Sequence, residues 1–242
     1  MLNESMLSQN LIYSSPRIFE RRRRILEEAR QLVSECGYEG FGIRELCQRA
    51  QVAPQTVYKA FGNKERLVTL AIRQHFESFS EHQKFFYQRS TLHGVVERII
   101  ISDAGTRVSR EYVAALVAIH FSQTAQDDLR EAAQFHIVGT LQPWAVALRE
   151  AGHLRRGFSP EMLVQNITHL LFGISLDWCR SAISDDEFLQ QKITSVLLCG
   201  AGATRGAAQK ELSGYLTDAL GKQELIDSVR ASTASATASG TS

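Results

Sequence analysis

Polar side chains with different hydrogen-bonding chemistry lie together in one short segment, Gln55-Thr56-Val57-Tyr58-Lys59. The hydroxyls of Thr56 and Tyr58 can each donate a hydrogen bond to a phosphate oxygen without burying a charge. Gln55 and Lys59 are four residues apart, so they share one face if the segment is helical. Glutamine can pair with adenine, and lysine with guanine, in the major groove of DNA. The structural alternatives are helix capping for Thr56, core packing for Tyr58 and a solvated polar pair for the other two.

Two cationic side chains flank this segment. Lys64 follows Asn63, a good N-cap residue, so we expect Lys64 in the first turn of a helix. A cation there opposes the helix dipole, but it can bind a phosphate that also meets the helix N–H groups. Arg44 stands at the start of a short predicted helix that would cross the DNA backbone. The predicted DNA contacts are therefore Arg44, Gln55, Thr56, Tyr58, Lys59 and Lys64.

The elements that must position these side chains are short helices. Apolar residues at helical spacing predict one helix over Ile43 to Ala50 and a second that begins at Pro54, where a missing N–H costs nothing. Gly62 ends the second helix. A longer predicted helix, from Ile18 to about Cys36, precedes them, and Gly37 stands where a C-cap glycine belongs. Two short helices joined by a tight turn and braced by a longer helix form the helix-turn-helix pattern.

Residues 25–71 resemble the DNA-binding domain of the TetR family of transcriptional regulators. The match is densest in Thr56-Val57-Tyr58-Lys59-Ala60-Phe61-Gly62-Asn63-Lys64-Glu65-Arg66-Leu67, which keeps the family spacing Thr-x-Tyr-x-x-Phe-x-x-Lys-Glu-x-Leu. Upstream, Ile43-Arg44-Glu45-Leu46 and Ala50-Gln51-Val52 fit the family's second helix and turn. The resemblance implies an all-α protein with an N-terminal three-helix helix-turn-helix domain and a larger C-terminal helical domain. It also implies a homodimer that binds palindromic double-stranded operator DNA and is released, as a repressor, by a small-molecule effector.

Three positions depart from the family pattern. Gln51 stands in the turn where the family usually has glycine, which costs about 1 kcal/mol if the backbone there is left-handed. Ala53 precedes the second helix of the motif in place of a capping Ser or Thr. Gly42 replaces the Thr or Ser before the first. These departures bear on the operator sequence more than on the fold.

The charge distribution says more than the formal net charge of +1. Residues 1–66 carry 11 Lys and Arg against 8 Asp and Glu, and the basic residues are densest at Arg21-Arg22-Arg23-Arg24. Such a run is either a solvated helix face or a surface for an anionic partner such as DNA phosphate. Hydrophobic residues make up 44% of the 242 residues, which supports a sizeable core and excludes wholesale disorder.

Several classes of protein are disfavoured by what the sequence lacks. No apolar run is long enough to cross a bilayer and residues 1–15 do not form a secretory signal, so we expect no membrane partner. The 4 cysteines form no CxxC pair, so no metal site is predicted, and a cytoplasmic chain with reduced thiols is the simplest interpretation. No nucleophile–base pair or glycine-rich phosphate loop occurs at a telling spacing, so we predict neither a cofactor nor an enzyme.

These patterns divide the chain into four parts. We expect a flexible tail over 1–15, a helix-turn-helix DNA-binding domain over 16–66, a helical effector-binding and dimerisation domain over 67–230, and a disordered tail over 231–242. Strand alternation is absent. Helices in the larger part are expected from Lys64 to about Arg89, Leu92 to Ser102, Arg110 to Gln123, Ala125 to Ala151, Pro160 to Ile183 and Asp185 to Cys199.

The larger domain is expected to pair two subunits and to hold the effector. Segments Pro160–Ile183 and Asp185–Cys199 carry more apolar residues than one inward stripe requires, so they are the pairing candidates; a thick monomer core is the alternative. Polar or aromatic residues inside apolar helices are the effector candidates, with a core role as the alternative for each. They are His120, His136, Trp144, Asn166, His169 and Trp178. The sequence shows no clear cationic clamp, so an apolar or aromatic effector is favoured.

Other functions stay open at this point. The chain could be an activator, a DNA-binding factor without a ligand, an all-helical enzyme, or a helical adaptor that no longer binds DNA. The adjacent acids Asp127-Asp128 and Asp185-Asp186 suit helix N-termini better than catalysis. In the main hypothesis, ligand binding shifts the helix that begins at Lys64. This shift changes the separation of the two helix-turn-helix domains of the dimer, here called the reading heads.

Overall fold

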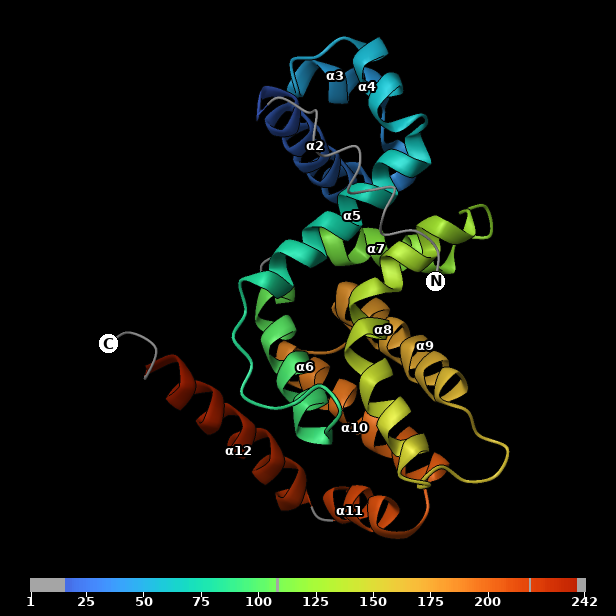
Figure 1. Cartoon of the computed structure of the whole chain (residues 1–242), viewed down its shortest axis with the longest axis vertical. Coiled ribbons are helices and arrows are strands. Elements are labelled where there is room, and N and C mark those ends of the chain that lie inside the picture. Colours follow the sequence, from blue (N-terminus) through green and yellow to red (C-terminus); the bar gives the residue numbers. More distant parts are fainter. Residues whose placement is uncertain (1–15, 108, 218, 239–242) are drawn as a thin grey trace.

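The computed structural model describes residues 16–107, 109–217 and 219–238, and these form eleven helices and no strand (Figure 1). The predicted all-α class is thereby confirmed, while the predicted tail over 1–15 lies outside the described residues. Within the described part, no helix is long and apolar enough to cross a membrane. The helices are α2 Pro16–Gly40, α3 Ile43–Arg49, α4 Pro54–Phe61, α5 Lys64–Glu81, α6 Leu92–Arg107, α7 Arg110–Phe121, α8 Asp127–Glu150, α9 Pro160–Cys179, α10 Asp185–Ala203, α11 Gly206–Thr217 and α12 Ala219–Ala238.

Helices α2, α3 and α4 form one end of the molecule, opposite α11 and α12 (Figure 1). The apolar stripe of α2 meets the buried faces of α3 and α4, where Leu46, Val57 and Phe61 lie in the core. Helical geometry breaks at Gly37, whose φ of 70° confirms a glycine at the predicted C-cap position. The turn between α3 and α4 contains Gln51 at a φ of 52°, the left-handed conformation that disfavours side chains.

The arginine run on α2 holds the two short helices by their C-terminal carbonyls. The guanidinium of Arg22 donates to the carbonyl oxygen of Ala60 (3.1 Å) and lies 4.5 Å from the ring centre of Phe61. Arg24 donates to the carbonyl oxygen of Ala50, at the end of α3 (3.2 Å). Cations at helix C-termini satisfy free carbonyls and complement the helix dipole. Part of the basic run therefore has a structural role, which the sequence pattern alone did not distinguish from a solvated face.

Helix α5 begins as predicted but ends earlier than expected. The Asn63 side chain accepts a hydrogen bond from the backbone N–H of Arg66 (2.8 Å), so Asn63 is the N-cap. The expected end near Arg89 is wrong, because α5 stops at Glu81. A fully buried carboxylate on α6, Glu97, accepts hydrogen bonds from the backbone N–H groups of Phe86 (2.7 Å) and Tyr87 (3.0 Å). These bonds hold residues 82–91 as a connection that runs back to α6.

Two glycines inside helices allow close packing. Helix α6 continues past Gly105 to Arg107, and a Cβ at Gly105 would lie 3.3 Å from the ring of Phe79. Helix α10 continues through Gly200 to Ala203. A Cβ at Gly200 would lie only 2.9 Å from the ring of Trp144, so glycine is required there for α8 and α10 to approach.

The C-terminal part differs most from the expectation. The disordered tail predicted over 231–242 is corrected as far as residue 238, because α12 continues to Ala238; residues 239–242 lie outside the described range. Leu225, Ile226 and Val229 are buried, and α12 packs against α6. The hydroxyl of Tyr87 is 3.0 Å from that of Ser232. The composition of this segment suggested a disordered tail. Alanine, however, has the highest helix propensity, and packing against α6 stabilises α12.

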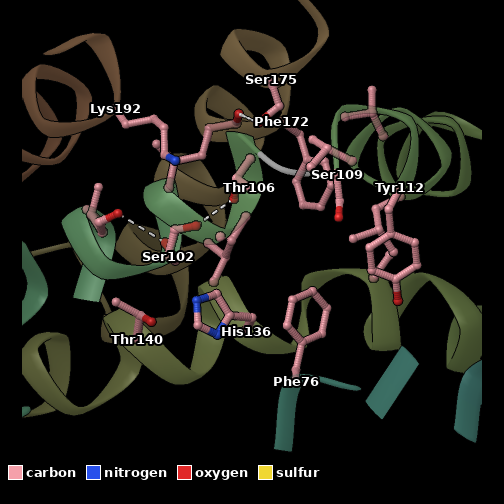
Figure 2. A pocket seen from close by; sticks show the side chains of 18 of the residues that line it. Phe76, Ser102, Thr106, Ser109, Tyr112, His136, Thr140, Phe172, Ser175 and Lys192 are labelled. Carbon is pink, nitrogen blue, oxygen red and sulfur yellow. Dashed lines mark hydrogen bonds between the residues drawn. The ribbon is translucent and has the colours of Figure 1, made fainter. Parts of the chain in front are cut away.

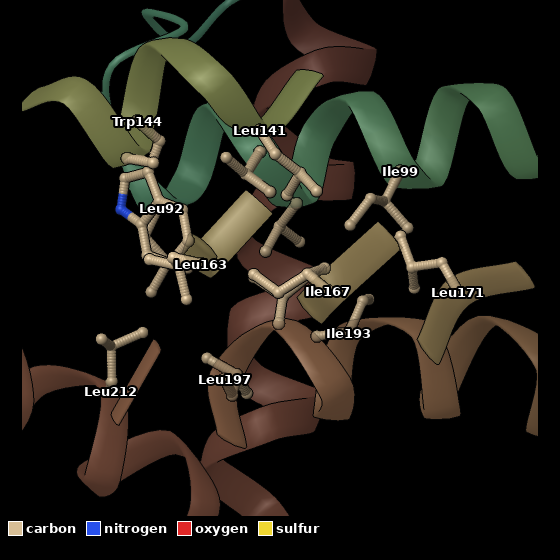
Figure 3. Packing of buried hydrophobic residues seen from close by; sticks show 14 of the residues in the cluster. Leu92, Ile99, Leu141, Trp144, Leu163, Ile167, Leu171, Ile193, Leu197 and Leu212 are labelled. Atoms are coloured by element: carbon tan, nitrogen blue, oxygen red, sulfur yellow. The ribbon is translucent and has the colours of Figure 1, made fainter. Parts of the chain in front are cut away.

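The buried residues form two clusters, and one of them crosses the expected domain boundary. It unites the core of α2, α3 and α4 with residues of α5, α7 and α8, such as Ile72, Ile119 and Leu129. The second cluster lies between α6, α8, α9, α10 and α11 (Figure 3). The predicted division between residues 66 and 67 therefore falls inside a shared core.

His120 is part of this shared core. Its ring stacks on Phe172 with ring centres 3.9 Å apart, and its Nδ1 is 3.1 Å from the amide nitrogen of Gln134. Burial lowers the pKa of His120 from 6.5 to about 4, and the neighbouring His169 and Arg130 act in the same direction. The folded protein therefore holds this imidazole neutral at pH values where an unfolded chain would protonate it.

Replacing Gln51 by glycine should stabilise the protein. Glycine adopts a positive φ without the steric cost that a side chain meets, so the free energy of unfolding should rise by about 1 kcal/mol. The melting temperature, measured by calorimetry at fixed protein concentration, should rise by about 2–4 °C. The matched control Gln48→Gly, at an exposed position inside α3, should lower stability by about 1 kcal/mol. A lower melting temperature for Gln51→Gly would contradict the assigned turn conformation.

Mild acid should destabilise the protein through His120. Between its unfolded pKa near 6.5 and its folded pKa of about 4, the unfolded state binds the extra proton, so stability falls as pH falls through this window. We expect His120 to account for about 1 kcal/mol of the loss between pH 7.5 and 5.5. Denaturant unfolding of His120→Phe should show a correspondingly shallower pH dependence. Phe121→Leu, at the exposed neighbouring residue, should keep the wild-type slope.

Candidate functional site

The outer face of α4 presents polar side chains to solvent. Gln55, Tyr58 and Lys59 are exposed, whereas Val57 and Phe61 on the opposite face are buried. The Tyr58 side chain is the clearest case, because this large aromatic residue is 52% exposed. Within the described part of the chain, no hydrogen bond or ion pair engages these three polar side chains. The structure therefore excludes core packing for Tyr58 and leaves this face of α4 available to a partner.

Thr56 and Arg44 complete the helical part of the predicted contact set. Thr56 is half-buried, and Ala53 rather than Thr56 occupies the N-cap position of α4 without a side-chain cap. Arg44 is exposed in the first turn of α3, whose N-cap Gly42 also lacks a side-chain hydrogen bond. Two further cations, Arg17 and Arg21, are exposed near the start of α2. The helices that carry these cations and hydroxyls, α2, α3 and α4, lie together at one end of the molecule (Figure 1).

Lys64 is held against aromatic rings at the start of α5. Its ammonium lies 4.4 Å from the ring centre of Tyr38 and 5.8 Å from that of Phe41. Cation–π attraction of this kind fixes the direction of a long side chain that would otherwise be mobile. Burial, together with the nearby Glu65, raises the pKa of Tyr38 to about 12, so its ring stays neutral. The DNA role of Lys64, like those of Arg44, Gln55, Thr56, Tyr58 and Lys59, stays a prediction.

A cavity of about 320 Å³ lies between α5, α6, α7, α8, α9 and α10 (Figure 2). Its walls are mainly apolar and aromatic, with Phe76, Val113, Leu116, Leu141 and Phe172 among them. A small number of polar groups also face it, namely His75, Ser102, Thr106, Ser109, Tyr112, His136, Thr140, Ser175 and Lys192. Mostly apolar walls with a few polar groups are typical of small-molecule sites.

Only His136 among the six predicted effector residues lines this cavity. Its ring stacks on Phe76 with ring centres 5.2 Å apart and meets the edge of Phe79 at 5.8 Å. Burial lowers the pKa of His136 to about 4, and the charge of Lys192 lowers it further. His136 is therefore a neutral imidazole at physiological pH.

The other five predicted effector residues lie outside this cavity. His120 lies behind Phe172 in the core and does not reach the cavity. Trp178 is fully buried, stacks on Phe188 and donates its indole N–H to Asp185 (2.8 Å). Trp144 packs beside Gly200 and borders a separate cavity of about 410 Å³ at the α11 side. Asn166 and His169 are exposed on α9.

Lys192 is the charged cavity residue that the sequence analysis did not predict. This lysine on α10 is buried, and its ammonium is 3.4 Å from a carboxylate oxygen of Asp103. Burial lowers the pKa of Lys192, while the charge of Asp103 opposes that change. A signal was present, because Lys192 falls between Phe188 and Val196 in the inward stripe of α10. A cation at such a position must be paired or functional.

Tyr112 joins the cavity to α2, the helix that packs against α3. Its ring lines the cavity, lies 5.2 Å from the ring centre of His75 and receives the guanidinium of Arg30 on α2 at 5.6 Å. Arg30 is in turn paired with Glu27 (2.6 Å). The buried Tyr112 hydroxyl has no hydrogen-bond partner within the described structure. A displacement of the Tyr112 ring would therefore act directly on Arg30 of α2.

Comparisons with known proteins agree with this architecture. The family model described as "Bacterial regulatory proteins, tetR family" matches residues 25–71. The HTH-type transcriptional repressor KstR of Mycolicibacterium smegmatis is 25% identical over 160 residues, which cover 57% of this chain and 78% of that protein. KstR of Rhodococcus jostii is 38% identical over 65 residues, which cover 27% of this chain and 31% of that protein.

A solved structure extends the likeness to both helical parts. TylP, a TetR regulator from Streptomyces fradiae, superimposes with a TM-score of 0.56 at 16% sequence identity. The alignment covers 88% of this chain and 99% of that one, and it shows a common fold. The helix-turn-helix geometry, the family match and the repressor relatives lead to one conclusion: residues 25–71 form a helix-turn-helix domain of the TetR family of transcriptional regulators.

Proposed function

We propose that this regulator is a homodimeric repressor that binds palindromic operator DNA and is released by a small-molecule effector. The observation that carries the proposal is the unpartnered outer face of α4, with Gln55, Tyr58 and Lys59 exposed side by side. The names of the KstR relatives support repression as the sign of regulation.

In this proposal α4 enters the major groove and the neighbouring elements hold the phosphates. Gln55 and Lys59 share the exposed face of α4, so both can reach base edges. Tyr58 and Thr56 donate hydroxyl hydrogen bonds to phosphate oxygens, and Arg44 meets the backbone from α3. Lys64 binds a further phosphate at the N-terminus of α5, where its contacts with two rings already orient it.

Dimerisation in this proposal uses the outer faces of α9 and α10, which pack side by side. Most apolar residues of these helices, including Ile167 and Ile193, are buried within one chain, so the apolar excess is smaller than the sequence suggested. Exposed apolar side chains nevertheless remain at Met162, Leu170 and Leu198. A two-fold contact over these faces would bury them and hold two reading heads for half-sites about 34–36 Å apart.

Effector release is proposed to act on α2 as well as on α5. The cavity is bordered by α5 and α7, and α2 packs against both helices. A ligand that displaces Tyr112 would press on Arg30 and shift the helix that braces α3 and α4. A coupling free energy of about 1–3 kcal/mol would weaken operator binding about 5- to 150-fold.

Operator binding should depend on Lys64 through both affinity and salt. We expect the purified protein to shift duplex DNA from upstream of its own gene, and Lys64→Met to weaken that binding. Loss of one phosphate contact by a cation should lower the slope of log K against log salt by about 1. Fluorescence anisotropy across a salt series measures both quantities.

The control for this experiment removes the same charge elsewhere. Lys84→Met, at an exposed site on the connection after α5, should keep the wild-type slope and affinity. Equal effects of the two variants would argue for a diffuse electrostatic attraction, and the absence of any salt-sensitive duplex binding would refute the regulator proposal.

Dimerisation should be lost when a charge is placed on the α10 face. Leu198→Glu would bring two carboxylates into the apolar contact of a symmetric dimer, where each would be desolvated without a partner. Sedimentation should show a shift from twice the chain mass to a single chain of 27.1 kDa. Phe86→Glu, at an exposed hydrophobic residue outside α9 and α10, should leave the dimer intact. A dimer that tolerates Leu198→Glu would place the interface on other helices.

A further inference from the structure

We propose that the cavity selects an amphipathic monocarboxylate, with the acid group bound by Lys192 and an alkyl or aromatic body in the apolar remainder. This inference rests on the proposed effector role of the cavity and specifies its ligand class. It also adds an acid group to the expected apolar or aromatic effector, because the structure places a buried cation in the wall of the cavity.

Lys192 has donor capacity left over. An ammonium group carries three N–H donors, yet its hydrogen bond within the described structure is the long one to Asp103 (3.4 Å). The ammonium also lies 4.1 Å from the ring centre of Phe188, which orients it without using a donor. Figure 2 shows the side chain reaching toward Ser102 and Thr106 on one side of the cavity. A ligand acceptor at this position would fill the remaining donor directions.

The local charge balance favours an acid over a neutral acceptor. Lys192 is not the only cation bound to Asp103, because the other carboxylate oxygen of Asp103 accepts a hydrogen bond from Arg107 (2.9 Å). Two cations therefore share one buried carboxylate. Asp185 and Asp186 lie 3.8 Å from Arg107 at the surface, on the side of that guanidinium rather than of Lys192. A ligand carboxylate would neutralise the charge on Lys192 inside a medium of low dielectric, where pairing is strongest.

The other polar groups near Lys192 do not compete for this role. Ser102, Thr106 and Ser175 each donate their hydroxyl hydrogen to a helix carbonyl, at 3.1, 2.7 and 2.8 Å respectively. They present only acceptor lone pairs to the cavity, which repel a carboxylate but do not displace one from an ammonium. Lys192 is consequently the cationic group that defines the acid-binding end.

The rest of the cavity suits a compact apolar body. Its volume of about 320 Å³ lies near the lower end of the range of about 300–1,000 Å³ for small-molecule sites. The rings of Phe76, Phe172 and Tyr112 line the part away from Lys192 (Figure 2). Medium-length alkyl chains and single aromatic groups meet these limits, whereas large multiply charged ligands do not.

Calorimetric titration without DNA tests the assignment with two matched pairs of probes. Octanoate is compared with 1-octanol, and 4-phenylbutyrate with 4-phenyl-1-butanol, all at pH 7.5. At least one acid should bind at least 10-fold more tightly than its alcohol. Lys192→Met should weaken acid binding about 10- to 100-fold, as expected for loss of a charged hydrogen bond, and change alcohol binding less than about threefold. Asp103 keeps its bond to Arg107 in this variant, which preserves the fold.

Two further variants locate the binding. Val113→Trp, which fills the cavity, should abolish the binding of both acid and alcohol. Lys84→Met, an exposed charge outside the cavity, should leave both affinities unchanged. Alcohols that bind as tightly as the acids, acid binding that survives Lys192→Met or Val113→Trp, or failure of all four probes to bind would each overturn the assignment. If Lys192→Met fails to fold, the acid–alcohol comparison on the wild-type protein decides.

The outcome is separable from that of the repressor proposal. Because the titration contains no DNA, Lys192-dependent binding of acids would support the ligand class even if operator binding were never observed. Conversely, the cavity could bind these acids while none of them releases the protein from operator DNA. That result would refute effector release by these acids and leave the ligand assignment intact.

Discussion

The packing of α2 against α7 is the constraint on which the rest of the structure depends. The core of the helix-turn-helix continues into α5, α7 and α8 as a single buried cluster, so the reading head is not a separate body on a flexible linker. The same α2 supplies Arg22 and Arg24, which hold the C-terminal carbonyls of α4 and α3. Any displacement of α2 therefore moves the reading helix with it.

This arrangement gives the cavity a short mechanical path to the exposed polar face of α4. Tyr112 is a wall of the cavity and a direct neighbour of Arg30, so no long chain of intermediaries is needed. Close-packed interiors respond to added volume by small rigid shifts, because they contain few voids to absorb it. A ligand larger than the cavity of about 320 Å³ must therefore be accommodated by shifts of the helices around it.

Much of the N-terminal fold could be predicted because its signals are local. The helix boundaries at Pro54 and Asn63, the C-cap glycine at Gly37 and the buried positions Val57 and Phe61 follow from capping chemistry and periodicity. The strain at Gln51 was also anticipated, since the family pattern marks that position as glycine. The polar face of α4 is exposed as expected, although its contacts with DNA are a proposal.

The larger helical part could be predicted less well because its determinants are long-range. Glycines such as Gly105 and Gly200 are poor helix formers, so a sequence pattern favours helix breaks there. In the folded protein both lie inside helices and allow the rings of Phe79 and Trp144 to approach closely, a contact between helices that are distant in sequence. The same limit applies to the effector residues: aromatic and polar types were chosen by chemistry, but helix rotation buried Trp178 in the core and turned His169 to solvent. Lys192 was missed because its partner Asp103 is 89 residues away in the sequence, so the pairing is visible only in the folded protein.

The attachment of α12 affects how the protein should be trimmed or tagged for laboratory work. An experimenter guided by the run of Ala, Ser and Thr would cut the chain near residue 231. That cut would remove Ser232, whose hydroxyl meets Tyr87, and Thr233, which donates to Glu97 (3.3 Å). Glu97 holds the connection between α5 and α6, so a shortened or bulky C-terminus would loosen a segment far away in sequence and alter a wall-forming helix of the cavity.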